Sequence, residues 1–142
     1  ATQSIEEFIK NGRVLDIPQG LPKEMLSKKA GVFVSIHSKR GLKRIEKQTL
    51  IKTDDEGELR GCIGTFMPTK TNIAEEIIDN AISACSRDWR FAPITRYELP
   101  DLEINVDILS EPELIINNYL VNNSSPISQL NAKKYGVIVK TS

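Results

Sequence analysis

One short segment of the sequence, Leu59–Gly64, combines a cation, a nucleophile and two glycines. Side chains alternate between the two faces of an extended strand, which places Arg60, Cys62 and Gly64 together on one face. A guanidinium beside a thiol favours the thiolate, the nucleophilic form of cysteine. We therefore predict a small-molecule or protein-modification site, with Cys62 as the nucleophile and Arg60 binding an anionic group. Gly61 and Gly64 would let a ligand or another backbone come close.

The same residues also have a purely structural interpretation, which stays open. Free cysteine is among the most buried residue types, so Cys62 would then be a small core residue. Gly61 and Gly64 would serve tight backbone packing, and Arg60 would pair with a surface acid. The G-x-x-G spacing also matches the loop of a KH domain, but the match is weak because this loop encloses no basic residue.

A second candidate group consists of Arg87, Asp88 and Arg90, with Trp89 and Phe91 between and after them. Two arginines in this setting could bind an anion or stack on a base, and the group could line the same cleft as the thiol. In the alternative interpretation, Arg87 complements the C-terminus of a preceding helix and Asp88 holds an arginine, while Phe91 enters the core.

The sequence predicts no metal site and specifies no cofactor. Two cysteines and one histidine supply too few soft ligands for a zinc site built by the protein alone. His37, the only histidine, has no obvious acidic partner nearby in the sequence, so we expect a strand-edge residue rather than a general base. Cys85 lies on the apolar side of a predicted helix and is expected in the core.

The elements that would position these groups follow from local patterns. Residues Ser4–Ile9 are predicted as a short helix, with Ser4 and Glu7 at capping-box spacing and Gly12 as its stop. The apolar, β-branched segment Gly31–Ile36 is predicted as a buried strand.

Further along, we expect a strand at Thr49–Thr53, a turn at Asp54–Glu58 and a returning strand at Leu59–Phe66, which together form a hairpin. A well-buried helix is predicted after Asn72, which can cap it with Glu75 three residues on.

Later segments predict one strand at Leu102–Ile108 and another at Gly136–Val139, with a loop at Asn117–Pro126 between them. In the first of these strands apolar residues alternate with polar ones, which is typical of an antiparallel sheet with one buried face. The apolar residues expected to face the core are Leu102, Ile104, Val106 and Ile108.

Composition excludes some classes of function. The 19 Lys and Arg residues balance 19 Asp and Glu residues, which argues against bulk electrostatic binding of nucleic acid or of an acidic membrane. The basic stretch Lys39–Arg44 is therefore predicted to be a solvated loop or ribbon tip. No apolar run approaches the ~20 residues that a membrane helix needs, and we expect a cytoplasmic globular domain.

One pattern occurs twice. Lys28–Val34 and Lys133–Val139 share the sequence K-K-x-G-V-x-V. The repeat suggests two related half-units that begin with equivalent strands, the second of which is unfinished.

The string Leu59–Gly64 resembles the signature of the AMMECR domain family. Other stretches occur in the order typical of that family, and the resemblance runs from about Ala1 to Thr141. These stretches are Gly31–Val34, Arg90–Pro93, Glu98–Leu99, Leu102–Ile104 and Leu109–Pro112. Two features depart from the family pattern: an insertion between Ile36 and Leu59, and Trp89 where a proline is common.

The resemblance implies an α+β fold with a curved, mostly antiparallel sheet packed with helices and an internal duplication. It implies a single domain over residues 1–142 that lacks the C-terminal part of the family, because members normally continue past Val139. It also implies a Memo-type protein and a radical SAM protein as partners.

Three functional hypotheses follow. The first is the modification site around Cys62, and the second is a non-catalytic module that binds a partner protein. The third is a nucleic-acid-associated regulatory protein that would bind through four basic residues, Lys39, Arg40, Lys43 and Arg44. The near-neutral net charge weighs against this hypothesis. A homo-oligomer is compatible with all three hypotheses.

Overall fold

The computed structural model describes residues 1–39, 42–46, 49–52, 57–113, 131 and 136–138. The chain divides into two compact units, Ala1–Glu111 and Pro112–Ser142, and every described helix and strand lies in the first. None of the described helices is long and apolar enough to cross a membrane. The loop predicted at Asn117–Pro126 lies outside the described residues, and no strand is formed at residues 136–138.

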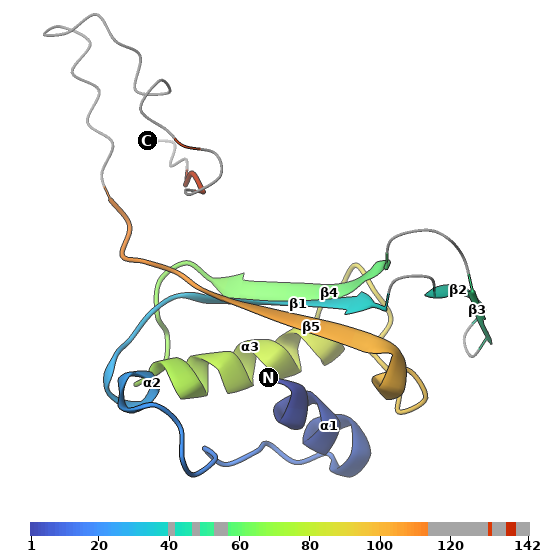
Figure 1. Ribbon diagram of the computed structural model, residues 1–142, viewed down its shortest axis with the longest axis horizontal. Coiled ribbons are helices and arrows are strands. Elements are labelled where there is room, and N and C mark those ends of the chain that lie inside the picture. The colour runs from blue at the N-terminus through green and yellow to red at the C-terminus, as the bar shows by residue number, and fades with distance from the viewer. Residues whose placement is uncertain (40–41, 47–48, 53–56, 114–130, 132–135, 139–142) are drawn as a thin grey trace, which may run out of the picture. The chain divides into compact units, whose positions relative to one another are not determined.

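The first unit is built on a three-stranded antiparallel sheet. Its order is β4 (Leu59–Thr65), β1 (Val32–Ser38) and β5 (Leu102–Ile108), with β1 in the middle and antiparallel to both neighbours. The sheet therefore has two edge strands, β4 and β5, which come from distant parts of the sequence (Figure 1).

The helices cover one face of this sheet (Figure 1). The long helix α3 (Ile73–Ser86) begins as predicted, because the Asn72 side chain accepts a hydrogen bond of 2.9 Å from the backbone N–H of Glu75. The shorter helix α1 (Thr2–Asn11) lies beside it and ends at Gly12, which has a φ of 67°. Two short helices, α2 (Lys23–Ser27) and η1 (Leu99–Asp101), complete the described helical elements.

The core lies between the sheet and these two longer helices. In β1 the buried residues alternate with half-buried ones, which puts Val32, Val34 and Ile36 on the covered face. They pack against residues of α1 and α3 that include Ile5, Ile77 and Ala81. Phe33, Ser35 and His37 consequently lie on the opposite face.

Two local predictions were wrong. Ser4 does not cap the first helix: the helix begins at Thr2 after Ala1, and Ser4 is buried within it. The predicted hairpin does not form either. Strand β3 (Thr49–Lys52) pairs with β2 (Leu42–Glu46), while β4 pairs with β1.

The β2–β3 pairing also changes the interpretation of the basic stretch. Lys43 and Arg44 belong to strand β2 of a two-stranded ribbon instead of a loop or a ribbon tip. Arg40 and Gly41 lie outside the described residues.

At the level of fold class, the prediction of an α+β protein with an antiparallel sheet packed by helices is confirmed. The internal duplication and the truncated second half stay predictions.

Candidate functional site

The candidate site lies on the face of the sheet that the helices leave uncovered. Strand register places Ser35 of β1 beside Cys62 of β4 on one side and Asn105 of β5 on the other. These three residues form a polar row across the middle of the sheet, on the face opposite α1 and α3. The thiol predicted to do chemistry is thus on the uncovered face, and Cys62 is half-buried there.

The Cys62 side chain has one close partner. Its Sγ lies 3.2 Å from the Oγ of Ser35, and either atom can be the donor of this hydrogen bond. The pairing joins a central strand to an edge strand across the sheet.

The main chain of Cys62 is held from outside the sheet. Its N–H donates to Asp88 Oδ2 at 2.9 Å, and its carbonyl oxygen accepts from Arg90 Nη2 at 3.0 Å. Neighbouring Gly61 and Ile63 turn their main-chain groups toward β1, so those of Cys62 point away from the sheet. Asp88 and Arg90 therefore occupy the positions that a further strand would fill.

These two residues also bind each other. Arg90 donates from Nε to Asp88 Oδ1 at 2.9 Å and from Nη2 to Asp88 Oδ2 at 2.7 Å, which is the two-pronged geometry of a strong ion pair. The guanidinium holds the pKa of the buried Asp88 carboxyl well below its usual range, with the Cys62 N–H adding to the effect. Asp88 in turn raises the pKa of Arg90. The clamp on Cys62 is thus an ionised pair.

Arg60 is engaged elsewhere. Its Nε donates to Glu98 Oε2 at 2.8 Å, and its Nη2 donates to the carbonyl of Ala92 at 3.4 Å. Burial opposes ionisation of Glu98, but hydrogen bonds from Arg60 and Thr95 outweigh burial, and the pKa of Glu98 is lowered. In the described part of the chain no hydrogen bond joins Arg60 to Cys62, so Arg90 is the guanidinium that binds Cys62.

The two glycines of the motif each adjoin a specific group. A Cβ added at Gly61 would lie 2.1 Å from the carbonyl oxygen of Ala84 in α3, and one added at Gly64 would lie 2.3 Å from the Phe33 ring. Close packing of α3 explains the first glycine, and the position of the Phe33 ring explains the second. A ligand is not needed to account for either.

The structure brings Cys62 together with Asp88 and Arg90, but it directs the third residue of that predicted group elsewhere. Arg87 pairs with Asp79 of α3 at 3.3 Å on the exposed side of the helix. His37 is half-buried on the uncovered face of the sheet, where the register places it opposite Glu103.

Cys85 contrasts with Cys62. It is buried, as predicted, and burial raises the pKa of its thiol to about 11. Among the described residues no group of three or more His, Cys, Asp or Glu side chains is arranged to hold a metal ion.

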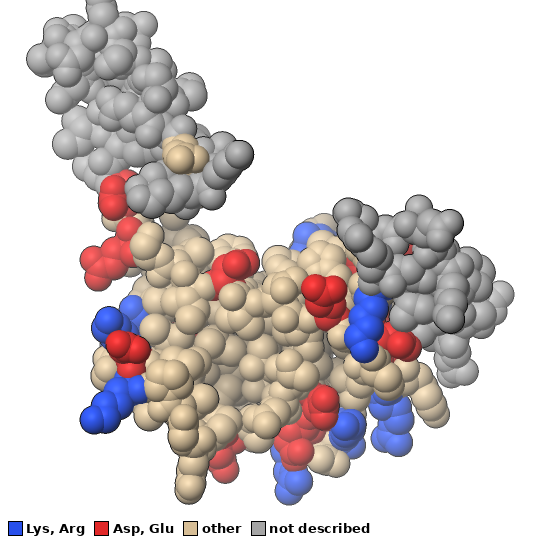
Figure 2. Space-filling model, in the orientation of Figure 1, with Lys and Arg blue, Asp and Glu red and all other residues tan. Residues whose placement is uncertain are grey.

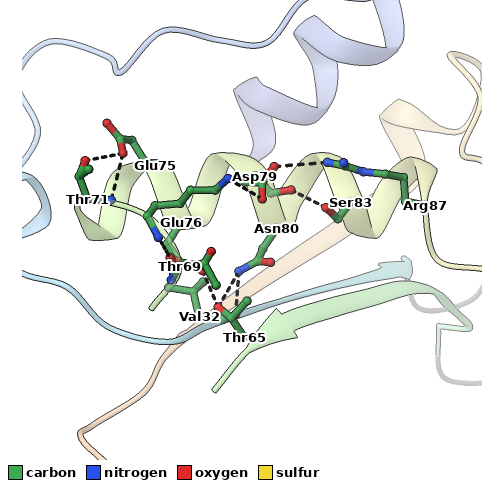
Figure 3. A network of polar contacts seen from close by, with 11 residues as sticks. Val32, Thr65, Thr69, Thr71, Glu75, Glu76, Asp79, Asn80, Ser83 and Arg87 are labelled. Atoms are coloured by element: carbon green, nitrogen blue, oxygen red, sulfur yellow. Dashed lines mark hydrogen bonds and ion pairs between the residues drawn. The ribbon is translucent and has the colours of Figure 1, made fainter. Parts of the chain in front are cut away.

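A second polar cluster lies between the sheet and the first turns of α3 (Figure 3). The buried carboxylate of Glu76 accepts hydrogen bonds from the hydroxyls of Thr65 and Thr69 and from the N–H groups of Thr69 and Lys70, at 2.6 to 2.9 Å. Burial opposes ionisation, but these bonds outweigh it and lower the pKa of Glu76. Glu76 therefore fixes the connection between β4 and α3.

Sequence reasoning missed several of these residues. Glu76 and Asn80 lie three and seven positions after Ile73, on the buried side of α3, where Asn80 donates to the carbonyl of Val32 at 3.0 Å. The sequence does contain a signal for Glu76 and Asn80, because both are polar residues at helical spacing from the apolar stripe of this helix. Ser35 and Asn105 had no such signal, because only strand register places Ser35 beside Cys62 and Asn105 beside Ser35.

Comparison with known proteins gives a consistent picture. The sequence profile described as AMMECR1 matches residues 1–142. A protein from Thermotoga maritima is 42% identical over 139 residues, which are 98% of this chain and 66% of that protein. Protein CA_C1420 from Clostridium acetobutylicum is 40% identical over 140 residues, which are 98% of this chain and 24% of that protein.

A solved structure is also similar. The crystal structure of the uncharacterized protein PH0010 from Pyrococcus horikoshii matches with a TM-score of 0.64 and 33% sequence identity. The match covers 82% of this chain and 50% of that one. This chain thus spans a part of each relative, from about a quarter to two thirds of its length.

Proposed function

This chain belongs to the AMMECR1 family, and we propose that it carries a modification site in which the thiol of Cys62 acts as the nucleophile. The substrate would approach the uncovered face of the sheet and meet Cys62 at one end of the row formed with Ser35 and Asn105.

One observation carries this proposal: the main chain of Cys62 is clamped on both its N–H and its C=O by an ionised Asp88–Arg90 pair, while its side chain is on the uncovered face. A reacting group works best when its position is set in advance by rigid neighbours. The buried Cys85 differs, because its carbonyl oxygen accepts from the backbone N–H of Ile94 and not from a charged side chain.

The surroundings favour a polar substrate, either a small molecule or a group on a protein. The hydroxyl of Ser35 offers a hydrogen-bonding group beside the thiol, and the amide of Asn105 offers a second one on the far side of Ser35. Glu103 and Asp107 lie on the same face of β5, and both are exposed. These carboxylates favour an uncharged or cationic substrate over an anionic one.

Alkylation tests the proposal with a control inside the same molecule. The folded protein is treated with iodoacetamide at neutral pH, and modification of each cysteine is followed by peptide mass spectrometry. We expect Cys62 to react in the folded protein and Cys85 only after unfolding. Equal resistance of both cysteines to alkylation in the folded protein would contradict the assignment of Cys62 as the nucleophile.

A second candidate function, binding of a partner protein, is supported by a different observation. The side chains of Trp89 and Tyr97 are 90% and 68% exposed. They belong to the segment 88–98, which hydrogen bonds attach to β4 at both ends. Asp88 accepts from the N–H of Cys62, and Glu98 accepts from the side chain of Arg60. Exposed aromatic residues on a rigid support are common energetic centres of protein interfaces.

The family resemblance makes a Memo-type protein and a radical SAM protein the first partners to test. A pull-down with each would compare the wild type with Trp89→Ala and, as the control, Val14→Ala, which changes another exposed apolar residue. Loss of capture with Trp89→Ala alone would support this function. Capture of neither protein by the wild type would count against it.

A further inference from the structure

His37 lies on the same face of the sheet as Cys62. Strand β1 alternates, so Phe33, Ser35 and His37 lie away from the core, and His37 is half-buried there. The register pairs Ser35 with Cys62, which makes His37 a diagonal neighbour of Cys62, two residues further along β1. Diagonal neighbours on one face are about 7 to 8 Å apart, a separation that aromatic side chains can span. The imidazole is therefore within reach of the thiol.

A β-bulge moves a cation away from the position opposite His37. The register pairs Ile36 with Gly61 and His37 with Leu59, so it skips Arg60. In a regular ladder Arg60 would lie opposite His37, where its guanidinium would oppose protonation of the imidazole. The bulge places the apolar Leu59 there instead, and the Arg60 guanidinium is bound by a carboxylate. Bulges are common beside active sites, where they redirect a side chain.

The neighbour of His37 on its other side is an acid. The register pairs His37 with Glu103 of β5, and the Cβ atoms of directly opposite residues are about 5 Å apart. Glu103 is exposed, and it lies on the uncovered face of the sheet with His37. In the orientation of Figure 2 the uncovered face points upward, and acidic side chains, in red, lie along it. The sequence shows no acidic partner near His37, but the fold supplies one.

Glu103 belongs to the part of β5 that is anchored in the core. Its neighbours Leu102 and Ile104 pack against the core, as the alternating pattern predicts. The expectation that Val106 and Ile108 do the same is wrong, because they are 36% and 50% exposed. The core contacts thus fix the backbone of β5 at Glu103.

Glu103 is the charged residue directly opposite the imidazole. Of the other described charged residues around the two side chains, Arg60 and Arg90 are each bound by a carboxylate, and Lys39 donates to a main-chain carbonyl. Neither the imidazole of His37 nor the carboxylate of Glu103 forms a hydrogen bond with a described residue, so each is available to the other. A carboxylate beside a histidine favours the imidazolium, the form that remains once the ring has taken up a proton.

We propose that His37 is the base that takes the proton from Cys62, and that Glu103 is the positioning residue that orients its imidazole. This inference rests on the proposed function, in which Cys62 is the nucleophile. The S–H bond breaks as an N–H bond forms on the ring, and the thiolate then forms an S–C bond with an electrophilic carbon of the substrate. The electron pair of the substrate bond that breaks departs with the leaving group, and the imidazolium returns the proton to it. The three residues thus share the logic of a catalytic triad, in which a third group orients the base.

The test measures how fast iodoacetamide alkylates Cys62 in the folded full chain, by peptide mass spectrometry. A free thiol is only a few per cent ionised at about pH 7, so loss of the base should slow the reaction there. We expect His37→Gln to lower the rate about tenfold at this pH, and to leave it within about twofold at pH ~9.5, where a free thiol ionises without help. Equal rates in wild type and variant at the lower pH overturn the proposal. An equal loss at both pH values also overturns it, because that result indicates a purely structural role.

Matched variants show whether the effect is specific. Glu103→Gln should lower the rate about threefold at the lower pH alone, while Glu111→Gln, the same change at an exposed acid beyond β5, should change neither rate. Phe33→Leu alters the same face of β1 on the far side of Ser35 and should also leave both rates within about twofold. If Phe33→Leu slows the reaction as much as His37→Gln, the base is refuted. If Glu103→Gln behaves like Glu111→Gln, the role of Glu103 is refuted.

The wild type separates this inference from the proposed function. If Cys62 reacts readily in the folded wild type and equally fast in His37→Gln, Cys62 remains the nucleophile but His37 is not its base. If Cys62 of the folded wild type resists alkylation as Cys85 does, both proposals are refuted. A reaction that slows only in His37→Gln and Glu103→Gln, and only at the lower pH, supports the proposal.

Discussion

The two edge strands of the sheet, β4 and β5, differ in the partners of their outward main-chain groups. At β4, the outward main-chain groups of Cys62 are bound by the side chains of Asp88 and Arg90. At β5, the outward groups of Val106 and its neighbours have no partner among the described residues. An exposed edge tends to recruit another strand, and at β4 the side chains of Asp88 and Arg90 occupy the main chain of Cys62 that such a strand would bind.

The difference shows that the two edges depend on different physical forces. Closure of β4 relies on charge, because the clamp consists of an ionised pair whose carboxylate is buried. In the described residues, β5 is held instead by its pairing with β1 and by the packing of Leu102 and Ile104 against the core. The predictions below change one edge at a time and use the other as the reference.

The largest effect is expected where β4 meets α3. Gly61→Ala would place a Cβ against the backbone carbonyl of Ala84, 2.1 Å away, and a backbone group cannot move aside cheaply. We expect a loss of about 3 kcal/mol or more in the free energy of unfolding, measured by urea denaturation. Asn105→Ala on β5 should stay within about 0.5 kcal/mol. A tolerated Gly61→Ala would contradict the close packing.

The clamp itself should be the next most sensitive. Asp88→Asn keeps the shape of the side chain but loses the charge, and its NH2 group cannot accept a hydrogen bond. A loss of about 2 kcal/mol in the free energy of unfolding is expected. Asp107→Asn makes the same chemical change at an exposed residue of β5 and should cost less than about 0.5 kcal/mol. Similar losses in the two variants would show that the clamp does not stabilise β4.

Acid should open the β4 edge. The folded protein has lowered pKa values for Asp88, Glu98 and Glu76. A lowered pKa contributes stability that is complete above the unfolded value, roughly 4, and is lost as the pH falls below it. The free energy of unfolding should therefore decline steadily from about pH 4 downward, with a smaller decline in Asp88→Asn. An identical decline in wild type and variant would exclude Asp88 as a contributor.

The smallest effect is expected at Gly64. A Cβ there would meet the ring of Phe33, but Phe33 is half-buried on the uncovered face, so a change of its χ1 torsion can move the whole ring aside. We expect Gly64→Ala to lower the free energy of unfolding by about 1 kcal/mol. If it costs as much as Gly61→Ala, the Phe33 ring is held more firmly than its exposure indicates.

Local patterns predicted the elements that depend on local chemistry. The helix after Asn72 and the strand at Leu102–Ile108 have the expected starts, because a side-chain cap and strict alternation are read over a few residues. The hairpin failed for the opposite reason. A turn-like sequence at Asp54–Glu58 favours pairing of its neighbours, but β4 pairs with β1, whose sequence lies far upstream.

The site was predictable only in part. The alternation at Leu59–Gly64 places Cys62 away from the core, as the structure has it, but it cannot identify the partners of Arg60. Glu98 and Arg60 are 38 residues apart, and no local pattern joins them. Alternation in β5 likewise indicates which face is apolar, but it does not indicate that packing against the core ends before Val106.

Amide hydrogen exchange, measured residue by residue by NMR, tests the contrast between the two edges most directly. The N–H of Cys62 should be protected by Asp88, and those of Asn105 and Asp107 by β1. The N–H groups of Ile104, Val106 and Ile108 should exchange much faster, which gives an alternating pattern along β5. Equal protection of Val106 and Asn105, or exchange at Cys62 as fast as at Val106, would contradict a closed β4 edge and an open β5 edge.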